Sequence, residues 1–294
     1  MIISVASGKG GTGKTFVATN LAVSLKKDVH LLDCDVEEPN SHLFLSPIID
    51  KTEPVIAPVP RIDLEKCTFC KKCMDICRYG AIAVLKKDVM IFENLCHSCG
   101  GCFAVCPENA LIEQQRILGQ IEHQTIGHQT IEHQTRDHIS FTHGRLDIGQ
   151  VMVPPIIKKV RSFTKHNQVT IIDAPPGTSC PVIAAMKGAH FILLVTEPTP
   201  FGLHDLKLAV ETVRILDIPH GLIINRAGLG NDDVKFYAME QNIPILMEIP
   251  FDKRIAQIYS NGQIVAEILP GYKEKFQDLY DRIIQLMEKK EKDK

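Results

Sequence analysis

Residues 7–15, SGKGGTGKT, decide the predicted fold. Before them lies the apolar stretch IISVA (2–6), and after them TFVATNLAVSLKK (15–27) carries apolar residues at helical spacing. A second apolar stretch, VHLLDCD (29–35), ends in acidic residues. A strand, a glycine loop, a helix and a second strand in this order form a βαβ unit. The sequence therefore predicts an α/β fold with a mostly parallel sheet flanked by helices.

The same stretch satisfies the phosphate-loop pattern G-x-x-x-x-G-K-[ST]. Backbone N–H groups of such a loop surround phosphate oxygens, Lys14 reaches the β- and γ-phosphates, and the Thr15 hydroxyl is available to Mg²⁺. The flanking strand and helix disfavour the alternative of a glycine-rich turn that binds nothing. We therefore expect ATP and Mg²⁺ as cofactors. The predicted nucleotide contacts in the loop are Gly8, Gly10, Gly11, Thr12, Gly13, Lys14 and Thr15.

Composition excludes several protein classes. The chain has 294 residues, of which 45% are hydrophobic and 23% charged, as in soluble globular proteins. A net charge of −2 provides no basic field for nucleic acid or an anionic membrane. No apolar run approaches the roughly 20 residues of a membrane span, and the chain starts with a strand rather than a signal peptide. The ten cysteines are therefore expected to be reduced, in the cytoplasm, and to bind metal.

The α/β pattern is interrupted once along the chain. Prolines crowd residues 46–62, which predicts an extended linker. Four more buried strands are expected at 169–175, 190–198, 220–227 and 243–250, with helices near 182–188, 204–216, 231–241, 252–261 and 273–290. We predict a discontinuous ATPase domain (1–57 and 149–294), an inserted domain (58–115) and a β-rich connector (116–148).

Two cysteine runs in the insert share the spacing C-x₂-C-x₂-C-x₃-C. This is the two-cluster bacterial ferredoxin pattern, in which the fourth cysteine of each run ligates the other cluster. Zinc is the alternative, but zinc sites usually assemble from two separated ligand pairs. Arg78 follows the first run, where proline is usual. The first predicted [4Fe–4S] cluster has Cys67, Cys70, Cys73 and Cys106 as ligands, and the second has Cys77, Cys96, Cys99 and Cys102.

A second lysine in the phosphate loop, Lys9, makes KGGTGKT resemble the deviant Walker A motif (SIMIBI type) of the MinD/ParA superfamily, which includes Mrp-type proteins and the nitrogenase iron protein. The resemblance implies an ATPase that works as a face-to-face dimer, in which Lys9 crosses to the partner's phosphates. The partner subunit is either identical or a paralogue. The alternative for Lys9 is a solvated loop lysine.

The resemblance also implies roles for polar residues at strand ends. Asp173 matches the Walker B aspartate that holds Mg²⁺ through water, and Asp35 matches the switch I aspartate that orients the attacking water. Asp33 is a candidate to support them, and Asn225 occupies the place where relatives hold adenine. With Lys9 and Lys14, Asp35 and Asp173 form the predicted catalytic set. The alternative is that these acids cap the loops that follow them.

Across residues 1–290 the chain resembles MinD-superfamily P-loop ATPases with an inserted ferredoxin-like domain of α+β class. The motifs that carry this resemblance are SGKGGTGKT, LLDCDVEEPN, both cysteine runs, GRLDIGQ and DAPPGTSCP. It implies ATP-gated electron transfer to a redox partner. Two alternatives are an Mrp-type carrier that delivers clusters to an apo-acceptor and a positioning ATPase.

Four remaining features give further predictions. Cys180 lies seven residues after Asp173, where the nitrogenase iron protein is similar, so it is either a ligand of a cluster bridging the dimer or a packed residue. Cys34 is expected in the core. The repeat in 121–138 spaces histidines by five, which no single strand or helix gathers on one face, so hairpins are favoured over a metal site. The C-terminal helix is expected to pack on the domain rather than on a membrane.

Overall fold

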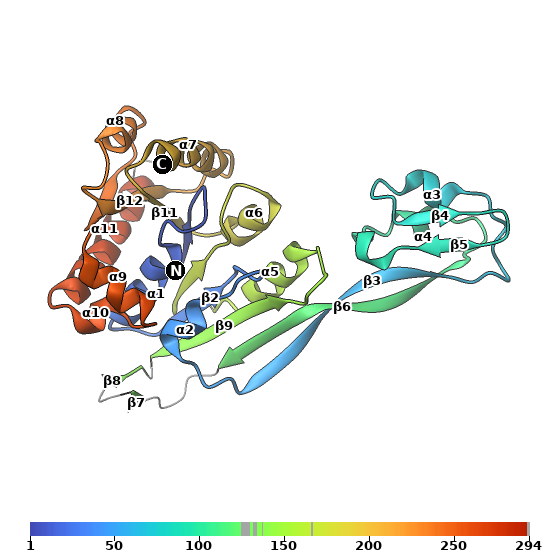
Figure 1. Ribbon diagram of the computed structural model, residues 1–294, viewed down its shortest axis with the longest axis horizontal. Coiled ribbons are helices and arrows are strands. Elements are labelled where there is room, and N and C mark those ends of the chain that lie inside the picture. The colour runs from blue at the N-terminus through green and yellow to red at the C-terminus, as the bar shows by residue number, and fades with distance from the viewer. Residues whose placement is uncertain (125–129, 132–133, 137, 166, 293–294) are drawn as a thin grey trace.

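The computed structural model describes residues 1–124, 130–131, 134–136, 138–165 and 167–292. Within them, nine strands form one sheet in the order β13-β12-β11-β1-β10-β2-β9-β6-β3 (Figure 1). From β13 to β9 neighbouring strands are parallel, whereas β6 and β3 are added antiparallel. These strands are β1 (Ile2–Ala6), β2 (Val29–Asp33), β3 (Lys51–Ile62), β6 (Leu111–Gln124), β9 (Ile139–Leu146), β10 (Val169–Asp173), β11 (Phe191–Thr196), β12 (His220–Ala227) and β13 (Ile245–Pro250).

Helices cover both faces of the sheet, and each face has its own apolar core. Along β2, Leu31 belongs to one core and Leu32 to the other, because successive side chains of a strand point to opposite faces. This burial on both faces explains why the central strands read as continuous apolar runs. One layer consists of α1 (Lys14–Ser24), α2 (Ser41–Leu45), α9 (Lys253–Ser260), α10 (Val265–Ile268) and α11 (Tyr272–Lys292). The other consists of α5 (Val153–Arg161), α6 (Cys180–Met186), α7 (Pro200–Ile215) and α8 (Asp233–Glu240).

The predicted α/β architecture with a mostly parallel sheet is confirmed, but the linker prediction for residues 46–62 is wrong. Lys51–Ile62 is the edge strand β3, paired with β6 over its whole length. Pro58 and Pro60 lie two residues apart in β3, which is the last strand of the sheet. Proline is tolerated there because an edge strand needs donors on only one side.

Residues 116–148 contribute to the main sheet. Strand β9 is parallel to β2, with Asp33 opposite His143, and β6 is antiparallel to β9. Of the histidines spaced by five, His123 thus lies near the end of β6 and His143, five residues after His138, lies in β9, while His128 and His133 lie outside the described residues. Two short strands, β7 (Thr130–Ile131) and β8 (Gln134–Thr135), pair with each other between them. The domain boundaries at 58, 116 and 149 stay a prediction.

The cysteine runs lie in a small lobe at the far end of the long β3–β6 ribbon (Figure 1), where Ser98 contacts Met152 at the start of α5. The lobe contains α3 (Lys72–Ile76), β4 (Ile82–Val84), β5 (Val89–Ile91), the 3₁₀ turn Glu93–Leu95 and α4 (Gly101–Val105). Its apolar clusters are small. One consists of Val59, Ala81 and Cys96, and Cys77 packs against it.

Candidate functional site

A cavity of about 380 Å³ opens beside the phosphate loop, at the carboxyl ends of the parallel strands. Parallel α/β sheets bind ligands at this end. The loop lies between β1 and α1, so the first turn of α1 faces the cavity with its unpaired N–H groups. The cavity lining includes Gly10, Gly11, Gly13, Lys14, Thr15, Asp35, Asn40, Asn225, Phe251, Ile255 and Tyr259.

Gly13 and Asn225 fix the shape of the phosphate loop. The Asn225 Nδ2 donates a 2.8 Å hydrogen bond to the backbone oxygen of Thr12. Gly13 has φ +99°, and a Cβ at that position would lie 2.3 Å from the same Nδ2. A residue with a side chain would therefore suffer both backbone strain and a clash. Asn225 lines the cavity and also braces the loop, and its contact with a base stays a prediction.

The geometry around Asp173 fits a Mg²⁺ site. The Thr15 Oγ1 donates a 2.5 Å hydrogen bond to Asp173 Oδ2, and the Ser41 Oγ donates to the same oxygen at 3.2 Å. Asp173 is fully buried, and its Oδ1 has no hydrogen-bond partner among the described residues. Burial, followed by the nearby Asp33 carboxylate, raises the pKa of Asp173. A hydrated divalent cation would neutralise this charge and satisfy the orphan oxygen.

Asp33 organises the loop after β2. Its carboxylate accepts hydrogen bonds from the backbone N–H groups of Asp35, Asn40 and Ser41 at 3.0–3.1 Å. Asp35 is thereby held at the cavity, where burial and then the Asp33 charge raise its pKa to about 6. Sequence reasoning did not single out Ser41, because a serine in a loop carries no signal until the fold brings it to Asp173.

Some predicted loop residues do not line the cavity. Gly8 packs on α7, where an added Cβ would lie 2.1 Å from the backbone oxygen of Asp205. The Lys9 Nζ lies 3.6 Å from Glu197 Oε2, and Arg226 contacts the other carboxylate oxygen at 2.5 Å. Within one chain, therefore, Lys9 does not line the nucleotide cavity and is paired with an acid.

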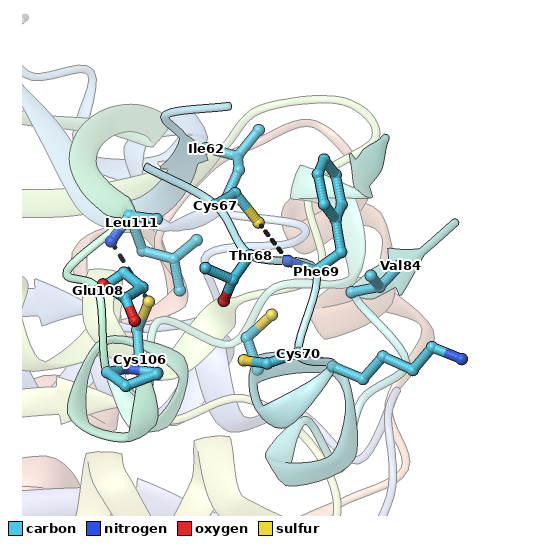
Figure 2. Close-up of a pocket in the computed structure, with 13 residues that line it drawn as sticks. Ile62, Cys67, Thr68, Phe69, Cys70, Val84, Cys106, Glu108 and Leu111 are labelled. Atoms are coloured by element: carbon cyan, nitrogen blue, oxygen red, sulfur yellow. Dashed lines mark hydrogen bonds between the residues drawn. The ribbon is translucent and has the colours of Figure 1, made fainter. Parts of the chain in front are cut away.

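The eight array cysteines surround two cavities, four to each. Cys67, Cys70, Cys73 and Cys106 line the first, which Figure 2 shows with Cys67, Cys70 and Cys106 labelled. The second is lined by Cys77, Cys96, Cys99 and Cys102. The fold thus brings the fourth cysteine of each run to the other run.

Backbone N–H groups point at the sulfur atoms in the same way in both runs. Phe69 N donates to Cys67 Sγ and Ser98 N to Cys96 Sγ, each at 3.4 Å. Phe69 and Ser98 both have positive φ, which turns their N–H groups inward. Ala81 N and Ala110 N likewise donate to Cys77 and Cys106 at 3.3 Å. Such bonds favour thiolate ligands and set the potential of a bound cluster.

Protonation of the thiols also bears on metal binding. Burial raises the pKa of Cys102 to about 11, so binding of a metal there would release a proton. Among the described residues, no three His, Cys, Asp or Glu side chains meet closely enough to hold a single metal ion. A cubane differs in this respect, because each of its thiolates bonds a different iron atom.

The remaining predictions have mixed outcomes. Cys34 is fully buried in the core, as predicted. Cys180 is exposed at the first residue of α6, so the packed alternative is wrong for the single chain. The apolar face of α11 packs on the domain through Phe276 and Ile283, as expected. No described helix is both long and apolar enough to cross a membrane.

The chain matches the CobQ/CobB/MinD/ParA nucleotide binding domain over residues 3–265. It belongs to this family. An uncharacterized protein of Methanocaldococcus jannaschii is 30% identical over 274 residues, which cover 90% of both chains. The iron-sulfur cluster carrier protein of the same organism is 22% identical, covering 98% of this chain and 85% of the carrier.

Solved structures agree on the fold of this CobQ/CobB/MinD/ParA member. The septum site-determining protein MinD from Pyrococcus horikoshii, complexed with Mg-ADP, superimposes with a TM-score of 0.57 at 21% identity, covering 96% of this chain and 95% of MinD. At that identity the likeness establishes the P-loop architecture and nothing finer. The nucleotide-binding class of the protein therefore rests on the family match and on the loop geometry.

Proposed function

We propose that the protein binds and hydrolyses ATP as a dimer and uses the resulting conformational switch to gate electron transfer through two [4Fe–4S] clusters in a ferredoxin-like insert. The observation that carries this proposal is the partition of eight cysteines into two four-thiol cavities on a chain that also has a P-loop. A chain that only positions cell components needs no such cavities. The clusters, when bound, would supply one-electron redox chemistry.

The residues of each site have separate tasks. Lys14 and the loop N–H groups bind the phosphates, while Thr15 and Asp173 hold Mg²⁺, the latter through water. Asp35, whose pKa of about 6 leaves it mostly ionised at pH 7, orients the attacking water. Lys9 leaves Glu197 and reaches the phosphates of the partner subunit, where it stabilises the charge of the transition state.

Chain connectivity supports coupling between the two sites. Ser41 begins α2 and bonds the Walker B carboxylate, and β3 follows α2 and runs to the cysteine lobe. Val59, near the end of β3, packs against Cys96. A change at the γ-phosphate that releases Ser41 would move the segment that leads to the clusters.

Stopped-flow oxidation of the reduced protein tests the gating. The dithionite-reduced protein, freed of excess reductant, is mixed with the one-electron acceptor benzyl viologen, with ATP or ADP. We expect ATP to change the oxidation rate severalfold in the wild type and not in Lys14→Ala, whose clusters remain intact. Equal rates with ATP and ADP in a protein that hydrolyses ATP normally would contradict gating.

A cluster carrier is the second candidate function. It is favoured by the exposure of Cys180 at the start of α6, just after the segment that follows Asp173, and by the carrier protein among the relatives. Two Cys180 thiolates at a dimer axis would hold a cluster in transit. For this function, Cys180→Ala should lower the iron content of the dimer and abolish transfer to an apo-ferredoxin. Unchanged iron and transfer would exclude it.

A further inference from the structure

Arg116 is a buried residue within a run of exposed residues of β6. Its exposed fraction is 7%, whereas Ile112, Gln115 and Ile117 on the same strand are exposed. The cysteine lobe and the loop before α5 cover it. An arginine is seldom buried without a carboxylate partner, because desolvating the guanidinium is costly.

The contacts of Arg116 are all with neutral groups of the described chain. Its Nη1 donates to the backbone oxygen of Glu93, and its Nη2 donates to the backbone oxygen of Cys96 at 3.2 Å and lies 3.5 Å from Met152 Sδ. The Nε has no partner among the described residues. No described carboxylate forms an ion pair with this cation, and the guanidinium is held against the backbone of Cys96, which lines the second cavity.

We propose that Arg116 is the built-in counter-cation of the cluster held by Cys77, Cys96, Cys99 and Cys102, and that it raises the reduction potential of this cluster. This inference rests on the proposed function. Four thiolates outweigh the charge of the cluster core, so the bound group is an anion, and one-electron reduction adds one negative charge. A nearby cation in a poorly hydrated site stabilises the reduced form more than the oxidised form.

The contact with Met152 ties this cation to the nucleotide-binding part of the chain. Met152 immediately precedes α5, and the Ser98 Oγ, from the second cysteine run, also lies 3.8 Å from its sulfur. Arg116 therefore joins the cysteine lobe to the main sheet through its contacts with Cys96 and Met152, and it places a positive charge at this junction. Arg116 does not line the second cavity itself but reaches that site through the backbone oxygen of Cys96. The only basic residue in the lining of the first cavity is Lys71, which is exposed.

Anaerobic redox titrations followed by electron paramagnetic resonance test the proposal on the full-length protein. In Arg116→Gln we expect one of the two midpoint potentials to become more negative and the other to stay unchanged, whereas Arg116→Lys restores most of the shift. Lys87→Gln is the control, because Lys87 is an exposed cation of the same lobe that lines neither cysteine cavity. A purely structural role for Arg116 would alter cluster loading but leave the potential of the loaded protein unchanged.

A second pair of variants keeps Arg116 and its hydrogen bonds. Met152→Glu brings a carboxylate to the guanidinium and should lower the same potential, while the similarly shaped Met152→Gln should not. If Arg116→Gln loses its iron and its potentials cannot be measured, the two Met152 variants still test whether charge near Arg116 changes the potential. If cluster-loaded Arg116→Gln or Met152→Glu has the same two midpoint potentials as the wild type, the proposed role of Arg116 is wrong, but the assignment of two clusters is unaffected. A wild-type protein without clusters would instead overturn the proposed function.

Discussion

At the scale of single residues, the phosphate loop depends on close packing around Gly13. Asn225 and Gly13 come from opposite halves of the sequence, and the amide fills the space that a side chain would need. The loop sequence alone predicts that Gly13 faces phosphate. It does not predict Asn225 as a brace, since no pattern links positions 212 residues apart.

Gly13→Ala should therefore weaken nucleotide binding at least about tenfold, or about 1.4 kcal/mol. Positive φ costs an alanine roughly 1–2 kcal/mol, and its methyl group must displace the Asn225 amide. Isothermal titration with ADP and Mg²⁺ measures the affinity. Gly188→Ala is the control, because Gly188 has φ +77°, an added Cβ there would meet only Arg161 Nη2 at an ordinary 3.9 Å, and Gly188 does not line the cavity. Equal affinities for the two variants would contradict the packing argument.

At the scale of elements, sequence patterns predicted the central strands well and the edge of the sheet poorly. Apolar runs of the kind seen in β10 and β11 arise because both faces are buried. Strand β3 lies at the edge, carries prolines and is partly exposed, so its pattern is that of a linker. The pairing of β9 with β2 was not predicted, because the two strands lie far apart in the sequence. Helix α5 was not predicted either.

The β2–β9 pair contains a buried histidine that makes stability depend on pH. The Nε2 of His30 is 2.9 Å from Thr142 Oγ1, and burial, then the charge of Lys165, lowers the His30 pKa from 6.5 to about 4. As the pH falls, His30 therefore takes up its proton at a higher pH in the unfolded chain than in the folded chain. The free energy of unfolding keeps its full value with respect to His30 above pH 6.5 and decreases as the pH falls from 6.5 toward 4.

Between neutral pH and about pH 5, His30 should account for the loss of about 2 kcal/mol of the free energy of unfolding. Urea unfolding at the two pH values measures this difference. In His30→Asn the difference should shrink by that amount, whereas His204→Asn, which changes an exposed histidine, should behave like the wild type. An identical pH dependence in His30→Asn and wild type would rule out His30 as the cause.

At the scale of the whole molecule, the position of Lys9 predicts a dimer. In one chain this lysine is paired with Glu197 and does not line the nucleotide cavity, so its predicted contact with phosphate is with that of a second subunit. Sequence resemblance indicated this role. The ion pair that holds Lys9 in the single chain became visible only with the fold.

Lys9→Ala should bind nucleotide like the wild type but hydrolyse ATP at least about a hundredfold more slowly, because it removes a transition-state cation. It should also remain monomeric with ATP in analytical ultracentrifugation. Lys26→Ala, at an exposed lysine, should show wild-type hydrolysis and association. A monomeric wild type with normal turnover would refute the dimer.

The two four-cysteine cavities are the feature on which the account depends most, and iron and acid-labile sulfide analysis tests them directly. Anaerobically prepared protein should contain about eight iron and eight sulfide atoms per chain, and about half of each after Cys70→Ala or Cys99→Ala. Colourless protein containing zinc, or iron far below this content, would contradict the assignment of two [4Fe–4S] clusters.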